Sequence, residues 1–191
     1  KMIFDQGLGD PEGWADKFLD DKKDVKSIDD ALQGARDIIA EWINETAEVR
    51  DAMRRLFSKT AVIKSTVIKG KEQEGQKFKD YFEWEEQLSK IPSHRLLAMR
   101  RGEKELILSL DIFPSELEAI DLVERKIISG QNAAVQQVKI AIKDAYKRLL
   151  KPSMETDARV TTKKSADEEA IDVFSDNLRQ LLLAPALGQK R

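Results

Sequence analysis

Apolar residues recur at helical spacing along most of the chain. The clearest stripe follows Ser27 and comprises Ile28, Leu32, Ala35, Ile39 and Trp42, with Ile38 and Ile43 beside it. Spacings of three and four residues place such side chains on one face of a helix, and serine is a favoured N-cap. The pattern predicts a long amphipathic helix and a mainly α fold built as a helical bundle.

Several other helix boundaries can be placed. Asp10-Pro11-Glu12 starts a short helix through Trp14 and Phe18, since a capping side chain precedes proline and an acid. Thr46 caps a helix that follows the Ser27 helix with almost no loop, as in a helix-turn-helix or any helical hairpin. Helices are also expected after Ser93, Ser115, Asn132 and Ser165.

The end of the chain is expected to contain two separate helices. Pro152 should end the helix that starts at Asn132, and the polar residues 152–164 should form a link. Ser165 and Glu168 form a capping box for the last helix. That helix carries an apolar stripe and ends at Pro185 and Gly188; the stripe is Ile171, Phe174, Leu178, Leu181 and Leu182.

Two segments have the pattern of β-strands. Residues 61–69 (AVIKSTVIK) are rich in Val, Ile and Thr, and residues 105–113 (ELILSLDIF) alternate, with Leu106, Leu108, Leu110 and Ile112 on one face. A lone strand leaves its backbone groups unpaired, so the two should form a small antiparallel ribbon. A short helix is expected near residues 83–90.

The composition argues against most catalytic chemistry. The 191 residues include no cysteine and one histidine, His94, so thiolate metal sites and serine–histidine or cysteine–histidine centres lack their parts. The chain has no run of 18 apolar residues that would span a membrane. We expect a cytoplasmic protein with no cofactor, no metal, no membrane contact and no catalytic residue of its own.

Charge is unevenly distributed. Residues 50–108 hold 14 Lys or Arg and 9 Asp or Glu, a net charge of +5, whereas residues 1–49 have a net charge of −7. Basic residues near aromatic ones suit phosphate and base contacts. The candidate nucleic-acid-binding residues are Lys69, Lys71, Lys77, Lys79, Arg95, Arg100 and Arg101. The alternative is a solvated basic rim around a local aromatic core.

Three stretches resemble the Tex family of bacterial transcription accessory proteins, which are similar to a eukaryotic transcription elongation factor. They are GARDIIAEWINE (34–45), KGKEQEGQKFKDYFEWEEQLSKIPSHRLLAMRRGEKE (69–105) and ADEEAIDVFSDNLRQLLLAPALGQKR (166–191). The resemblance implies a longer protein. Its members have a helical region with a helix-turn-helix element, an RNase H-like domain thought to lack a complete active site, helix-hairpin-helix elements and a C-terminal OB-fold RNA-binding domain.

The resemblance also divides the chain. Residues 1–24 would end a preceding helical region, 25–113 would form a helix-turn-helix-like module with a β ribbon, and 114–188 would lead to the RNase H-like domain. The implied function is that of a nucleic-acid-binding, transcription-associated protein, with RNA or DNA and the transcription machinery as partners. No residue role is transferred from the family. The alternative function is a protein-docking scaffold that makes no nucleic-acid contact of its own.

Overall fold

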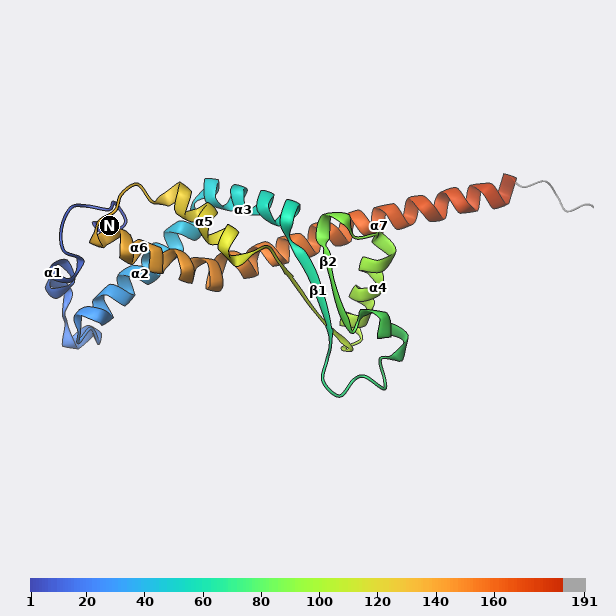
Figure 1. The fold of residues 1–191 in the computed structure, drawn as a ribbon, viewed down its shortest axis with the longest axis horizontal. Coiled ribbons are helices and arrows are strands. Elements are labelled where there is room, and N and C mark those ends of the chain that lie inside the picture. The colour runs from blue at the N-terminus through green and yellow to red at the C-terminus, as the bar shows by residue number, and fades with distance from the viewer. Residues whose placement is uncertain (184–191) are drawn as a thin grey trace, which may run out of the picture. The chain divides into compact units, whose positions relative to one another are not determined.

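The computed structural model describes residues 1–183, which form two compact units. Unit 1 combines residues 1–61 with 113–157, and unit 2 combines residues 62–112 with the chain from 158 onward (Figure 1). These units are defined by contacts. The predicted segments 1–24, 25–113 and 114–188 were instead placed by where the chain should lie within a full-length family member. Those boundaries stay a prediction.

Unit 1 is helical, and the mainly α fold class is confirmed. Its helices are α1 (Pro11–Ala15), α2 (Ile28–Glu45), α3 (Ala47–Thr60), α5 (Glu116–Ile127) and α6 (Ala133–Asp144), with 3-10 turns at Asp16–Phe18 and Asp21–Lys23 and a π-helical turn, η5 (Ala145–Leu150). The side chains of Asp10, Ser27 and Asn132 accept hydrogen bonds from backbone N–H groups at the starts of α1, α2 and α6, as predicted.

The start of α2 is a complete capping box. Ser27 Oγ accepts from the Asp30 N–H at 3.1 Å, and Asp30 Oδ2 accepts from the Ser27 N–H at 2.9 Å. The hydrogen bond with the Ser27 side chain lowers the pKa of Asp30. Two backbone donors that the helix leaves unpaired are satisfied in this way.

The core of unit 1 lies where α2 packs against α6 and η5. Ile39, Ile43, Val138, Ile142 and Tyr146 are buried there. The predicted inward stripe of α2 is partly wrong. Ile38 and Trp42 are 54% and 37% exposed, and Arg36 is buried in their place. The Arg36 guanidinium donates to Gln137 Oε1 at 2.9 Å and to Asp29 Oδ1 at 3.2 Å, so the buried group is hydrogen-bonded and its charge has a carboxylate partner.

Unit 2 is built on a three-stranded antiparallel sheet in the order β2-β1-β3. The strands are β1 (Val62–Val67), β2 (Glu83–Gln87) and β3 (Leu108–Phe113); the unit also contains η3 (Gln76–Tyr81), η4 (Leu88–Lys90) and α4 (Ser93–Lys104). The predicted neighbours β1 and β3 are confirmed. The helix predicted near residues 83–90 is wrong, because Glu83–Gln87 is paired with β1, with Trp84 opposite Ser65 and Glu85 opposite Lys64.

One face of the sheet is buried and the other is exposed. Ile63, Ser65, Leu108, Leu110 and Ile112 are at most 4% exposed. Ser65 is satisfied in this position because its hydroxyl donates to the Tyr81 carbonyl at 2.7 Å. The exposed side chains are mostly acidic; they are Lys64, Glu83, Glu85, Ser109 and Asp111.

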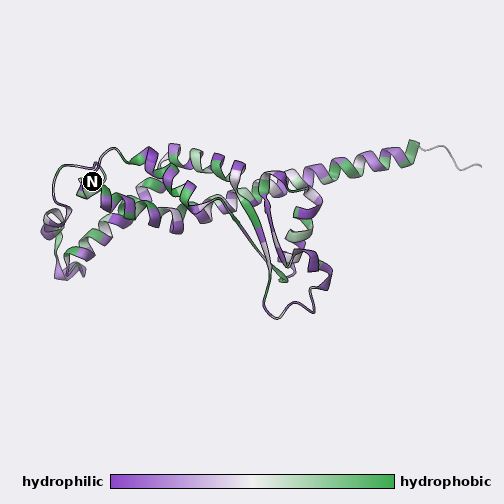
Figure 2. Cartoon of the chain, viewed as in Figure 1, coloured by the Kyte–Doolittle hydropathy of each residue, from purple (hydrophilic) through white to green (hydrophobic). Residues whose placement is uncertain are grey.

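The C-terminal part of the described chain is one helix, α7 (Lys151–Leu183). The predicted stop at Pro152, the link at 152–164 and the new start at Ser165 are therefore wrong. The π-helical turn η5 ends at Leu150, two residues before Pro152, and such turns shift the backbone hydrogen bonds that a proline would otherwise break. Figure 2 shows hydrophobic residues recurring along α7. The predicted end at Pro185 and Gly188 lies outside the described residues.

Candidate nucleic-acid interface

Most of the candidate cations meet at one end of the unit 2 sheet. The loop between β1 and β2, the last turn of α4 and the start of β3 come together there, below the sheet in Figure 1. The Ile68 N–H donates to the Ile107 carbonyl at 2.8 Å, so the start of this loop is bound to the segment that joins α4 to β3. We call this region the basic end and define its cations as Lys69, Lys71, Lys77, Lys79, Arg101 and Lys104.

Two glycines and a phenylalanine hold the segments of the basic end together. A methyl group at Gly75 would lie 2.3 Å from Ile107 Cγ2, and one at Gly102 would lie 2.6 Å from Leu108 Cδ1 and 3.3 Å from Phe78 Cδ1. Phe78 is 5% exposed. The loop, α4 and β3 therefore approach more closely than any side chain at these two positions would allow.

The cations of the basic end fall into two groups. Lys71 forms an ion pair with Glu74 at 2.6 Å, and Lys77 forms one with Glu105 at 2.5 Å and lies 5.0 Å from the centre of the Phe78 ring. Lys69, Lys79, Arg101 and Lys104 are exposed and have no ion-pair partner within residues 1–183. The second group is available to bind an anion.

Arg95 and Arg100 do not contribute to the basic end. Arg95 Nη1 donates to Glu86 Oε2 at 2.7 Å, and its guanidinium carbon lies 4.7 Å from the Trp84 ring centre. Arg100 Nη1 donates to Glu103 Oε2 at 2.9 Å, and Glu103 also accepts from Arg159 at 2.7 Å. Both candidate arginines are occupied by contacts within unit 2.

Sequence reasoning missed two residues of the basic end. Lys104 lies in the last turn of α4, where the negative end of the helix dipole favours a cation. Leu106 was predicted to face the core from a strand. It instead follows α4 in a left-handed conformation with φ of 57° and is 68% exposed. The alternation of ELILSLDIF conceals this because β3 begins only at Leu108.

The outer face of the sheet does not extend the positive surface. Lys64 lies opposite Glu85 in the β1–β2 register, and Glu83 and Asp111 are also exposed. A polyanion would be repelled from this face, because like charges within about 10 Å interact at physiological ionic strength. The electrostatics of unit 2 therefore favour the basic end over the sheet face.

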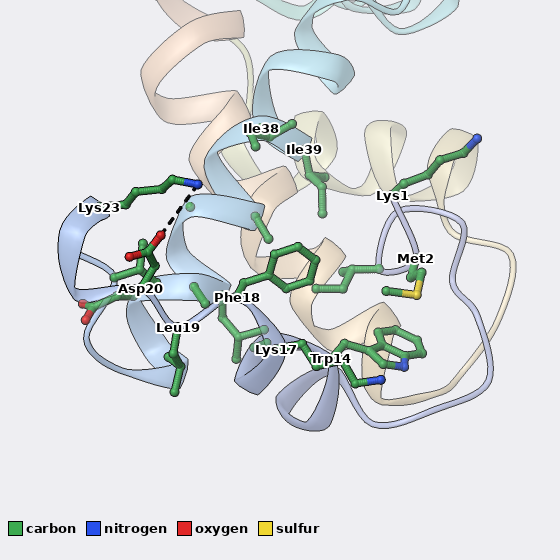
Figure 3. A pocket seen from close by; sticks show the side chains of 18 of the residues that line it. Lys1, Met2, Trp14, Lys17, Phe18, Leu19, Asp20, Lys23, Ile38 and Ile39 are labelled. Atoms are coloured by element: carbon green, nitrogen blue, oxygen red, sulfur yellow. Dashed lines mark ion pairs between the residues drawn. The ribbon is translucent and has the colours of Figure 1, made fainter.

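Unit 1 contains an apolar hollow of about 590 Å³ between α2 and the segment before it. Figure 3 shows the Phe18 ring in the hollow, with Trp14 on one side and Ile38 and Ile39 of α2 above. The lining charges are Lys1, Lys17, Lys23, Asp20 and Asp30. Asp20 forms an ion pair with Lys23 at 3.7 Å and Asp30 caps α2, so neither carboxylate is set up for proton transfer.

The described residues do not assemble a metal site. Within residues 1–183, no three His, Asp or Glu side chains are grouped to hold a metal ion. His94 is exposed at the first turn of α4. No helix in the same range is long and apolar enough to cross a bilayer.

Comparison with known proteins places this mainly helical chain in a family. The model of the Tex central region-like family matches residues 7–174. The chain therefore belongs to the Tex central region-like family, as the resemblance predicted.

Three relatives illustrate the match. The uncharacterized protein YdcI of Bacillus subtilis is 38% identical over 178 residues, which cover 92% of this chain and 25% of the relative. The transcriptional accessory protein Tex of Neisseria gonorrhoeae is 35% identical over 191 residues, covering 94% and 24%. The human S1 RNA-binding domain-containing protein 1 is 26% identical over 183 residues, covering 88% and 18%. The chain thus spans about a quarter or less of these relatives.

Proposed function

We propose that this chain is the central region of a transcription-associated, nucleic-acid-binding protein, and that its basic end contacts phosphates. Two relatives carry names that refer to transcription and to an RNA-binding domain. The observation that carries the proposal for this chain is the set of four exposed cations at the basic end that lack ion-pair partners within residues 1–183. Phosphate contacts by such cations release counterions and give salt-dependent binding.

The other parts of the proposal concern unit 1, catalysis, the cellular location and the partners. The helices of unit 1 act as scaffold, the chain has no catalytic role, and the protein works in the cytoplasm with RNA or DNA and the transcription machinery. The α2–α3 pair, joined at Thr46 alone, is offered as a helix-turn-helix-like element. The non-enzymatic part of the proposal is supported by the sequence, which contains no cysteine and a single histidine, His94.

The test measures binding of the chain to fluorescent 20-nucleotide DNA and RNA by anisotropy at several salt concentrations. Affinity should fall steeply with salt, and the triple variant K69E/K79E/R101E should flatten the slope of log K against log salt by about 0.7 to 0.9 for each lost phosphate contact. The matched control K22E/K126E/K143E changes the net charge equally in unit 1 and should keep the slope. Absence of binding at low salt, or an equal effect of both triples, would refute the proposal.

A second candidate function is docking of other parts of the full-length protein. It is favoured by exposed large apolar side chains on α7; Ile171, Phe174, Leu181 and Leu182 are 65%, 67%, 74% and 76% exposed. Contiguous exposed apolar side chains mark interaction sites. The proposed occupant is the polypeptide that makes up the other three quarters of the bacterial relatives. Hydrogen exchange on α7 in the full-length protein should show strong protection of residues 171–182 that is lost in this chain; equal exchange would exclude this function.

A further inference from the structure

The apolar hollow of unit 1 is lined by large side chains that remain in contact with water. Its volume is about 590 Å³, and Trp14, Phe18 and Ile38 are among the residues that line it (Figure 3). Phe18 is 64% exposed and Ile38 is 54% exposed. Trp42 also lines the hollow and is held by an edge-to-face contact with Phe4, with the ring centres 5.4 Å apart. Large apolar side chains exposed around one hollow mark an interaction surface.

The first turns of α2 present small residues to the hollow, namely Ala31, Gly34 and Ala35. A methyl group added at Gly34 would meet no atom within 4 Å, so the space above the helix backbone is open at this point. A glycine inside a helix costs about 1 kcal/mol relative to alanine, and no close packing within residues 1–183 requires it here. Small side chains let a second helix approach closely, because the distance between packed helices depends on the residues at the contact.

The charges that line the hollow favour an acidic occupant. Lys17 is exposed and has no ion-pair partner within residues 1–183. The side chain of Lys23 is 80% exposed, and its 3.7 Å ion pair with Asp20 is of the exposed kind that contributes little. Both lining carboxylates are already engaged, since Asp20 accepts from the Lys22 N–H at 3.0 Å and Asp30 caps α2. The cations are therefore more available to an occupant than the acids are.

A helix of another protein suits this surface better than a small molecule does. Sites for small ligands enclose most of the ligand surface, whereas Phe18 and Ile38 are exposed here. An amphipathic helix instead lays side chains at i, i+3, i+4 and i+7 into an open groove. Residues 1–49 have a net charge of −7, so attraction to the two lysines acts over only about 10 Å. This range suits a helix with a few carboxylates better than a long acidic tail.

We propose that the hollow binds an amphipathic helix of a separate protein, which packs large apolar side chains over Gly34 and pairs carboxylates with Lys17 and Lys23. Permanent interfaces are more apolar, whereas a polar rim around an apolar centre is typical of partners that associate and dissociate. The exposed lysines therefore favour a separate partner over a permanently docked segment of the same polypeptide. The inference goes beyond the proposed function, in which unit 1 acts only as scaffold.

The experiment measures binding of three fluorescent helical peptides of about 16 residues by anisotropy. They share Leu and Phe at i, i+3, i+4 and i+7 and carry glutamate, glutamine or lysine at the same flanking positions. The glutamate peptide should bind most tightly, with a Kd below about 100 μM. G34L should weaken its binding at least about tenfold without lowering the midpoint of thermal unfolding, because leucine fills the open space above α2. The matched control A47L adds a leucine at an exposed position outside the hollow and should bind like the wild type.

A second variant tests the same surface without altering α2. K17E/K23E should reverse the order of the glutamate and lysine peptides, whereas K126E/K143E, which makes the same charge change outside the hollow, should keep the order. Equal affinity of the wild type and G34L for the glutamate peptide, equal binding of all three peptides, or no binding at about 1 mM would overturn the proposal.

Two further measurements separate the proposed occupant from the others. Self-association of this chain in light scattering that G34L abolishes would assign the hollow to a second copy. Binding of the glutamate peptide by this chain but not by the full-length protein would assign it to another segment of the same polypeptide. Either result would overturn the proposal. The affinity of G34L for nucleic acid should equal that of the wild type, so failure of this inference leaves the proposed function standing.

Discussion

The central carbon of the Arg95 guanidinium lies 4.7 Å from the centre of the Trp84 ring, while Arg95 Nη1 donates to Glu86 Oε2 at 2.7 Å. Trp84 Nε1 also donates to Glu86, at 3.2 Å. The three side chains attach α4 to the edge strand β2. Arg95 therefore stabilises unit 2 and is not available to a phosphate.

The first prediction follows from this contact. R95A should lower the free energy of unfolding by about 1 kcal/mol, the sum expected for a partly exposed cation–π contact and a discounted ion pair. Its affinity for nucleic acid should stay within about twofold of the wild type. Urea unfolding followed by tryptophan fluorescence and anisotropy measure the two quantities. An R95A variant with unchanged stability and weakened binding would show that Arg95 contacts nucleic acid. R101A is the comparison variant; its affinity for nucleic acid should fall while its free energy of unfolding stays unchanged.

The second prediction concerns two helical glycines with opposite surroundings. G102A should lower the free energy of unfolding by about 1 to 3 kcal/mol, because the added methyl would meet Leu108 Cδ1 at 2.6 Å and Cγ at 2.9 Å. G34A should raise it by roughly 1 kcal/mol, since no atom lies within 4 Å and alanine is the better helix former. Denaturant unfolding of both variants provides the check. A G102A variant that is as stable as the wild type or more stable would contradict the close approach of α4 and β3.

The third prediction concerns alkaline pH. Burial, and then the charge of Glu116, raise the pKa of Tyr146 to about 12 from 10.0. The folded chain keeps this proton at a pH where the unfolded chain loses it, so the stabilisation is complete below pH 10 and is lost as the pH rises through about 12. The complete loss should amount to about 3 kcal/mol, of which about 2 kcal/mol is reached by about pH 11.5.

Other groups also titrate in this range, so the measurement needs a comparison. The difference in unfolding free energy between the wild type and Y146F should be constant up to about pH 10 and should then change in favour of Y146F by about 2 kcal/mol. Urea titrations at pH 8, 10 and 11.5 cover the window. A difference that is independent of pH would show that the Tyr146 hydroxyl is not desolvated in the folded state.

The sequence predicts the elements whose signals are local. Asp10, Ser27 and Asn132 cap helices because their side chains reach backbone donors within three residues. The apolar and β-branched residues of 61–69 similarly identify β1. These features depend on neighbours in the chain, so a single sequence contains them.

The features that the sequence did not predict depend on distant partners. Glu83–Gln87 has little intrinsic strand preference and is extended because Trp84 and Glu85 pair with Ser65 and Lys64. Pro152 is tolerated because the preceding turn is π-helical. Five of the candidate site residues were predicted from the sequence and lie together at the basic end: Lys69, Lys71, Lys77, Lys79 and Arg101. The ion pairs that occupy Arg95 and Arg100 could not be predicted, because they depend on where Glu86 and Glu103 lie in the folded chain.

The interleaving of the two units along the chain has a consequence for biogenesis. Unit 1 needs residues up to 157, and unit 2 resumes only at residue 158. During synthesis the strands and α4 therefore emerge before the first unit is complete. The packing of β1 to β3 within unit 2 is completed only after α7 has been synthesised. No single cut at a peptide bond separates the two units, so a nascent chain stalled near residue 113 should expose apolar surface from both and recruit chaperones.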